Sequence, residues 1–82
     1  MPRLRRLNGR ETIRILERFG FELVGIRGSH HHMRRIVDGE RQSINVPVHG
    51  NKPLSVGTLH SIYRQACMYI PETELKPHFY AD

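Results

Sequence analysis

The sequence predicts an α+β fold with two helices and a three-stranded antiparallel sheet, in the chain order helix, three strands, helix. Apolar residues recur at helical spacing in one segment near each end of the chain. Three runs of strand-forming residues, separated by turns that contain glycine, lie between these two segments. Both helices must bury an apolar stripe, and the sheet offers one apolar face. We therefore expect both helices on one face of the sheet, with the other face open for a ligand.

The first helix is expected over residues 9–19. Asn8 is a suitable N-cap, and Glu11 three residues later completes a capping-box pattern. Gly20 stands where a glycine commonly ends a helix. The preceding residues 1–7 form a basic arm that either contacts a phosphate backbone or is disordered. The inward positions of this helix are Thr12, Ile15, Leu16 and Phe19, with Ile13 on the flank.

Two turn signals divide the middle of the chain into three strands. Gly28 interrupts the first run, and the pair Asp38-Gly39 is typical of a two-residue hairpin turn. Pro47 has no N–H group to donate, which favours an edge position for the third strand. The expected strands are 21–26, 29–37 and 41–49.

The second helix is predicted to begin after Ser55, an N-cap residue. Pro71 ends it or opens a short third helix through Leu75, which Pro77 then stops. Residues 71–82 are thus expected to be a short helix or a frayed acidic tail. The inward positions of the second helix are Leu59, Ile62, Tyr63 and Ala66.

Length and cysteine usage restrict the class of protein. Eighty-two residues fit a single domain, residues 1–82, with its core over about 8–70. No apolar run reaches the roughly 18 residues of a membrane helix, and no apolar segment follows the basic N-terminus as in a signal peptide. The single cysteine, Cys67, excludes an internal disulfide and fits a reducing, cytoplasmic environment.

The charge distribution favours a polyanionic partner. Thirteen Lys and Arg against eight Asp and Glu give a net charge of +5. Residues 1–70 hold twelve of the basic and five of the acidic residues, and eleven of the thirteen basic residues are Arg, which suits forked contacts with phosphate. Nucleic acid is the simplest such partner. The alternative is a charge that serves solubility alone.

Three consecutive histidines follow the first glycine turn. Because side chains alternate along a strand, His30 and His32 share one face, and His31 lies on the other with Met33. Three interpretations follow: a metal site that also recruits His49, a structural role on a half-exposed sheet, or proton transfer. Histidine titrates near neutrality, so it can take a proton from a ribose 2′-hydroxyl.

Four motifs make the sequence similar to the HicA toxin family, also called YcfA-like. The similarity covers roughly residues 8–68, in the family's order and spacing. The motifs are Gly20-Phe21-Glu22-Leu23-Val24, Arg27-Gly28-Ser29-His30-His31, Val46-Pro47-Val48-His49-Gly50-Asn51-Lys52, and Gly57-Thr58-Leu59 with Ile62 and Arg64-Gln65-Ala66.

This resemblance implies a fold like the double-stranded RNA-binding domain and the activity of a small endoribonuclease. Family members are toxins that cleave mRNA and are held inactive by a HicB-type antitoxin protein. The essential histidine of the family corresponds to His31. The sequence departs from the family at His32, where an apolar residue is usual, at Pro53, and at Cys67-Met68 after the second helix motif.

A metal-independent cleavage, with no cofactor, is the expected mechanism. The sequence has no cluster of acidic residues for Mg²⁺, so His31 would act as general acid or base. Basic groups would stabilise charge on the phosphate or bind RNA, and the candidates are Arg27, Arg34 and Lys52. Ser29 either orients the imidazole or bonds within the turn. His49 is either a second acid–base group or an ordinary strand-end residue.

Two other classes of function remain open. The first is a non-catalytic RNA-binding module on the same fold, which would recognise duplex shape through phosphate and 2′-hydroxyl contacts. The second is a protein-interaction domain whose basic surface serves only an acidic partner. RNA cleavage that survives chelation and is lost with His31 would distinguish the enzyme from both.

Overall fold

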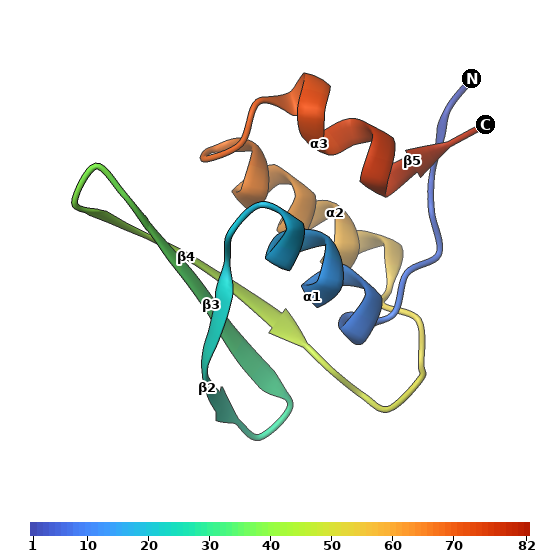
Figure 1. Ribbon diagram of the computed structural model, residues 1–82. Coiled ribbons are helices and arrows are strands. Elements are labelled where there is room, and N and C mark those ends of the chain that lie inside the picture. Colours follow the sequence, from blue (N-terminus) through green and yellow to red (C-terminus); the bar gives the residue numbers. More distant parts are fainter.

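The computed structural model describes residues 1–82 and has the predicted α+β architecture (Figure 1). Strands β2, β3 and β4 form an antiparallel sheet in that order, and the three helices lie on one side of it. None of the helices has the length and apolar composition of a membrane-spanning segment. The elements are β1 (Arg3–Leu4), α1 (Gly9–Arg18), β2 (Glu22–Arg27), β3 (His30–Val37), β4 (Glu40–Pro47), α2 (Val56–Cys67), α3 (Glu72–Phe79) and β5 (Tyr80–Ala81).

Both helix starts follow the predicted caps. The Asn8 side chain accepts a hydrogen bond from the Glu11 backbone N–H at 2.8 Å, and the Asn8 N–H donates to Glu11 Oε1 at 2.9 Å. Ser55 Oγ accepts from the Thr58 N–H at 3.2 Å at the start of α2. Gly20, just past α1, has φ +90°, the left-handed conformation that a glycine adopts without strain. Local chemistry thus sets the bounds of both helices.

The third strand is shorter than the sequence predicted. Asp38 and Gly39 both have positive φ, as the hairpin between β3 and β4 requires. β4 then ends at Pro47 instead of continuing to His49, because Pro47 is paired with His30 and β3 begins there. His49 therefore belongs to the loop that follows the sheet.

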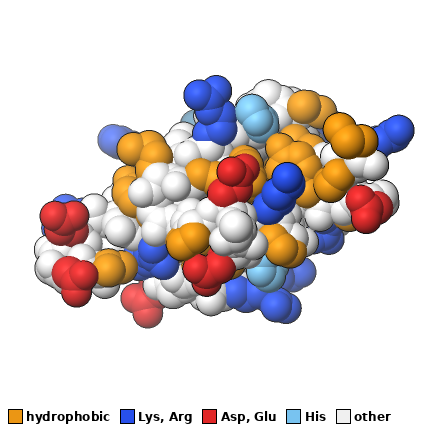
Figure 2. Space-filling view, turned by 90° about the horizontal axis from the view of Figure 1, so that it is seen from above, with side chains coloured by type: hydrophobic (Ala, Val, Ile, Leu, Met, Phe, Trp, Pro, Cys, Tyr) orange, Lys and Arg blue, Asp and Glu red, His pale blue; other side chains and the backbone are white.

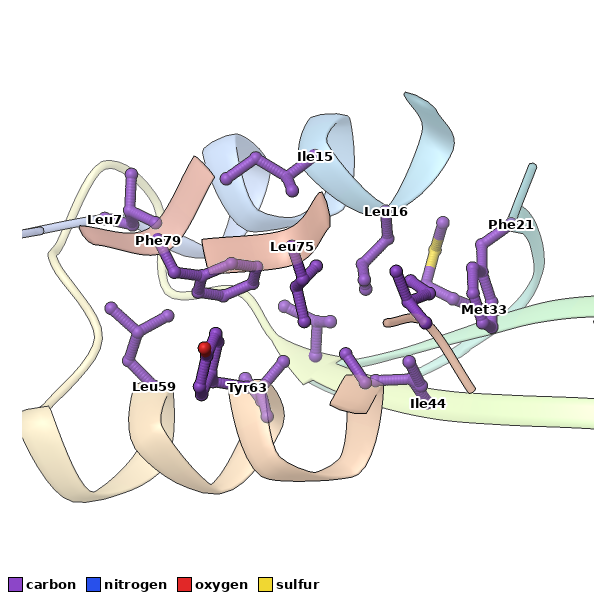
Figure 3. Packing of buried hydrophobic residues seen from close by; sticks show 14 residues of the cluster. Leu7, Ile15, Leu16, Phe21, Met33, Ile44, Leu59, Tyr63, Leu75 and Phe79 are labelled. Atoms are coloured by element: carbon purple, nitrogen blue, oxygen red, sulfur yellow. The ribbon is translucent and has the colours of Figure 1, made fainter. Parts of the chain in front are cut away.

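Fourteen buried side chains form one core between the sheet and the helices (Figure 3). The sheet contributes Met33 from β3 and Ile44 and Val46 from β4, and all three are at most 1% exposed. The predicted inward residues of α2 are all buried. The expectation that both helices share one face of the sheet is therefore confirmed. The remaining core residues are Leu7, Ile15, Leu16, Phe21, Leu59, Ile62, Tyr63, Ala66, Ile70, Leu75 and Phe79.

The C-terminal segment differs from the expectation of a helix stopped at Pro77 and a frayed end. Helix α3 passes through Pro77 to Phe79, and Leu75 and Phe79 are fully buried. An interior proline costs a helix hydrogen bond, but burial of these two side chains offsets that loss. The Phe79 ring lies 5.3 Å from the Tyr63 ring of α2. The third helix thus completes the core.

The N-terminal arm is likewise ordered, which corrects the alternative of a disordered arm, whereas its contact with a phosphate backbone stays a prediction. β1 pairs antiparallel with β5, so the two ends of the chain lie side by side (Figure 1). The Arg5 N–H donates to the Phe79 carbonyl at 2.8 Å, and Arg5 Nη1 donates to the His78 carbonyl at 2.8 Å. Leu7 is 1% exposed. Pairing of the two termini thus holds α3 against the other helices.

Arg35 on β3 ties the ends of two helices to the sheet. Its Nη1 donates to the Phe19 carbonyl at the end of α1 at 2.7 Å, and its Nη2 donates to the Tyr69 carbonyl just beyond α2 at 2.8 Å. The guanidinium also lies over the Phe21 ring, 4.9 Å from its centre. A cation at a helix C-terminus complements the helix dipole, and here one cation serves two helices.

We expect Arg35→Met to reduce the free energy of unfolding by about 2 kcal/mol, because the two carbonyls lose a charged donor and remain partly buried. Urea denaturation followed by circular dichroism measures the change. Arg41→Met is the matched control, since Arg41 is an exposed arginine one strand away, and it should alter stability by less than about 0.5 kcal/mol. Equal losses in the two variants would contradict the role assigned to Arg35.

Candidate functional site

His31 lies near the start of β3 on the side of the sheet that carries the helices. It pairs with Val46 of β4, and Met33 two residues later pairs with Ile44. Since paired residues share a face, His31 is on the core side, and His30 and His32 are on the open side. The predicted alternation is confirmed. His31 remains partly accessible, and its neighbour on β2, Ile26, is exposed.

The imidazole of His31 is held by the backbone of its own turn. Nδ1 lies 3.2 Å from the Ser29 carbonyl oxygen, which also accepts the Val48 N–H at 2.8 Å. A carbonyl oxygen can only accept, so Nδ1 must carry the proton of this bond. In the neutral ring, Nε2 is then the nitrogen with a free lone pair. The contact involves the Ser29 carbonyl, and no hydrogen bond of its hydroxyl is present.

The loop after β4 lies at the same end of the sheet as His31. It contains His49 and Lys52, both exposed, and the Lys52 N–H donates to the His49 carbonyl at 3.1 Å. The Leu54 N–H donates to the Leu7 carbonyl at 2.9 Å, which ties the loop to the chain just before α1. His31, His49 and Lys52 therefore belong to one end of the fold.

Gly9 allows α1 to begin directly on this end of the sheet. A Cβ atom at this position would lie 2.3 Å from the Pro47 carbonyl oxygen and 2.8 Å from Val48 Cγ2. Only glycine permits this approach of the helix to the end of β4. The sequence contained no signal for this contact. At Gly57 in α2, by contrast, a Cβ atom would meet nothing within 4 Å.

The open face of the sheet carries most of its basic side chains. Arg27 and His30 are cross-strand partners beside the turn, and Arg34 lies farther along β3, opposite Ser43. Glu22 is the one acidic residue of β2 on this face. Next to β4 the face continues into a groove against α2, lined in part by His30, Asn45, Gly57, Ser61 and Gln65. Arg27 and Arg34 thus project from the opposite side of the sheet to His31.

The helix side of the molecule also carries basic side chains, because Arg10, Arg14 and Arg18 are exposed at successive turns of α1. Figure 2 shows Lys and Arg side chains interspersed with acidic and apolar ones on the face seen from above. The structure also contains no group of three His, Cys, Asp or Glu side chains arranged to hold a metal ion. His30, His32 and His49 are therefore not gathered as the metal interpretation required.

Two titratable groups have clearly shifted pKa values, and both lie between α2 and α3. Burial raises the pKa of Tyr63, and the hydrogen bond from its hydroxyl to Glu72 Oε2, 2.7 Å long, raises it further. Burial also raises the pKa of the Cys67 thiol. Both groups are therefore neutral at physiological pH, and they support helix packing at a distance in the fold from His31.

Comparison with known proteins identifies one family for this chain. No curated protein and no solved structure matches the chain. The model of one protein family, described as the HicA toxin of bacterial toxin–antitoxin systems, matches residues 9–68. This range contains α1, the whole three-stranded sheet with His31, and α2. The chain therefore belongs to the HicA toxin family.

Proposed function

We propose that this toxin is a metal-independent endoribonuclease that cleaves mRNA and uses His31 as its general acid–base group. The observation that carries the proposal is the held imidazole, with Nδ1 bonded to the Ser29 carbonyl and Nε2 left free at the end of the sheet. Because its substrate would be mRNA, we place the protein in the cytoplasm.

In the proposed reaction, Nε2 of His31 removes the proton of a ribose 2′-hydroxyl. The 2′-oxygen attacks the neighbouring phosphorus, the bond to the 5′-oxygen breaks, and a 2′,3′-cyclic phosphate forms. The leaving oxygen takes a proton from water or from a second histidine, for which His49 is the candidate. One positioned histidine supplies roughly 10²–10⁴ in rate. Lys52 is the candidate for stabilising charge on the reacting phosphate, because it lies at the same end of the fold as His31. Arg27, the other expected candidate, projects from the opposite side of the sheet.

We expect His31→Ala to lower RNA cleavage by roughly 10²–10⁴, because the proton acceptor is removed. Cleavage of a labelled RNA in the presence of EDTA measures the effect. His30→Ala and His32→Ala are matched controls, since both side chains lie on the opposite face of the same strand, and each should retain most of the activity.

Two results would contradict this assignment. Full activity in His31→Ala would exclude His31 as the acid–base group, and loss of wild-type activity on chelation would exclude a metal-independent reaction. If the wild-type protein bound RNA without cleaving it under any condition, the non-catalytic RNA-binding module would be the correct function.

We propose that the RNA backbone crosses the basic open face and turns around residues 28–29 to reach His31. Arg27 and Arg34 contact phosphates on this path. The double variant Arg27→Ala/Arg34→Ala should weaken RNA binding and reduce the slope of log K against log salt by about 2, one unit for each lost phosphate contact. Titration at several salt concentrations measures the slope. Arg14→Ala on the exposed side of α1 should leave it unchanged.

A HicB-type antitoxin is the proposed protein partner, and it would cover His31 and the RNA-binding surface. The net charge of +7 on residues 1–70 fits an acidic partner, which electrostatic attraction would bring in rapidly. We expect the cognate antitoxin to abolish cleavage on binding and to associate more slowly as salt rises. Stopped-flow association and cleavage assays of the complex test this. A stable complex that still cleaves RNA would show that the antitoxin does not inhibit the toxin by covering His31.

A further inference from the structure

Strand β2 has a free edge that is unusually apolar. β2 lies at one margin of the sheet, and only its inner edge is paired, with β3. Leu23, Val24 and Ile26 are 44%, 48% and 59% exposed. The other edge strand, β4, carries Pro47 and has α2 beside it. Proteins commonly protect edge strands by such means, and β2 has charged residues only at its two ends.

A β-bulge gives β2 a symmetric pattern of faces. Leu23 and Ile26 pair with Met33 and His31, so both lie on the helix side. The end residues Glu22 and Arg27 pair with Arg34 and His30 and lie on the open side. The register shifts between Leu23 and Gly25, where Val24 is the extra residue. A regular strand could not place residues three apart on one face, and the bulge makes this possible.

The same pattern makes β2 complementary to itself. In an antiparallel pair centred between Val24 and Gly25, Glu22 stands opposite Arg27 of the second copy. Leu23 then stands opposite Ile26, and each opposed pair lies on the same side of the sheet. Without the bulge, this register would oppose residues on different faces. Opposite charges and apolar side chains are both favourable cross-strand pairs.

We propose that two copies of this chain associate through β2 in this register and form one continuous six-stranded sheet. The two-fold axis is perpendicular to the sheet, so both His31 side chains face the same side. The contact is a single six-residue strand from each copy, so the dimer is weak and depends on concentration. The proposal is independent of the proposed ribonuclease activity, because it rests on β2 alone.

Charge reversal with rescue tests the register. Sedimentation velocity over a concentration series should show a monomer–dimer equilibrium for the wild type. Glu22→Arg or Arg27→Glu alone should weaken dimerisation about tenfold, because two opposite-charge pairs become like-charge pairs. The double variant Glu22→Arg/Arg27→Glu should restore it. Arg41→Glu is the charge control and should leave the equilibrium unchanged, with circular dichroism confirming that each variant is folded.

A second pair of variants tests the apolar contact. Ile26→Lys should abolish dimerisation, and Ile36→Lys should not, although Ile36 on β3 is 63% exposed and Ile26 is 59% exposed. A chain that stays monomeric at every concentration would overturn the proposal. It would do so even if β2 were then found to bind a strand of another protein. Dimerisation that the double charge reversal fails to restore, or that Ile36→Lys abolishes instead of Ile26→Lys, would also overturn it.

Discussion

The contact of Arg35 with the ends of two helices is the constraint on which the rest of the fold depends. The side chain leaves β3 on the core side and donates to carbonyls of Phe19 and Tyr69, so α1 and α2 are fixed against the same strand. These two carbonyls stand where helix hydrogen bonding ends, and a charged donor satisfies both. Once the helix ends are fixed there, α3 can complete the core, and the paired termini hold it in place.

The position of His31 follows from the same strand. His31, Met33 and Arg35 are every second residue of β3 and therefore lie on one face. Met33 is held by the core, and Arg35 is held by the ends of the helices. A slip of one residue would send all three to the open face, at the cost of burying the polar neighbours of Met33. The register is therefore strongly specified. It places His31 at the end of the sheet, where its ring reaches the Ser29 carbonyl and remains accessible.

The basic side chains of β2 and β3 and the histidine proposed as the acid–base group lie on different faces of the sheet. Arg27 and Arg34 project on the open side, whereas His31 lies on the helix side. The face expected to be open for a ligand carries Arg27 and Arg34, whereas the histidine at the family's motif position, His31, lies on the other side of the sheet. The turn at residues 28–29 joins the end of β2, which carries Arg27, to the start of β3, which carries His31, and the proposed RNA path bends there. The bulge in β2 lies on the adjoining edge of the same sheet.

Features that depend on neighbouring residues in the chain were predictable from the sequence. The caps at Asn8 and Ser55, the hairpin at Asp38-Gly39 and the alternation around His31 all follow from local backbone chemistry. Arg35 could have been identified by the same alternation, but its partners lie 16 and 34 residues away. Four other features could be recognised only from the tertiary structure. They are the helix through Pro77, the paired termini, the close approach of α1 to β4 at Gly9, and the bulge at Val24. In each case, burial or pairing with a distant segment outweighed the local preference of the residue.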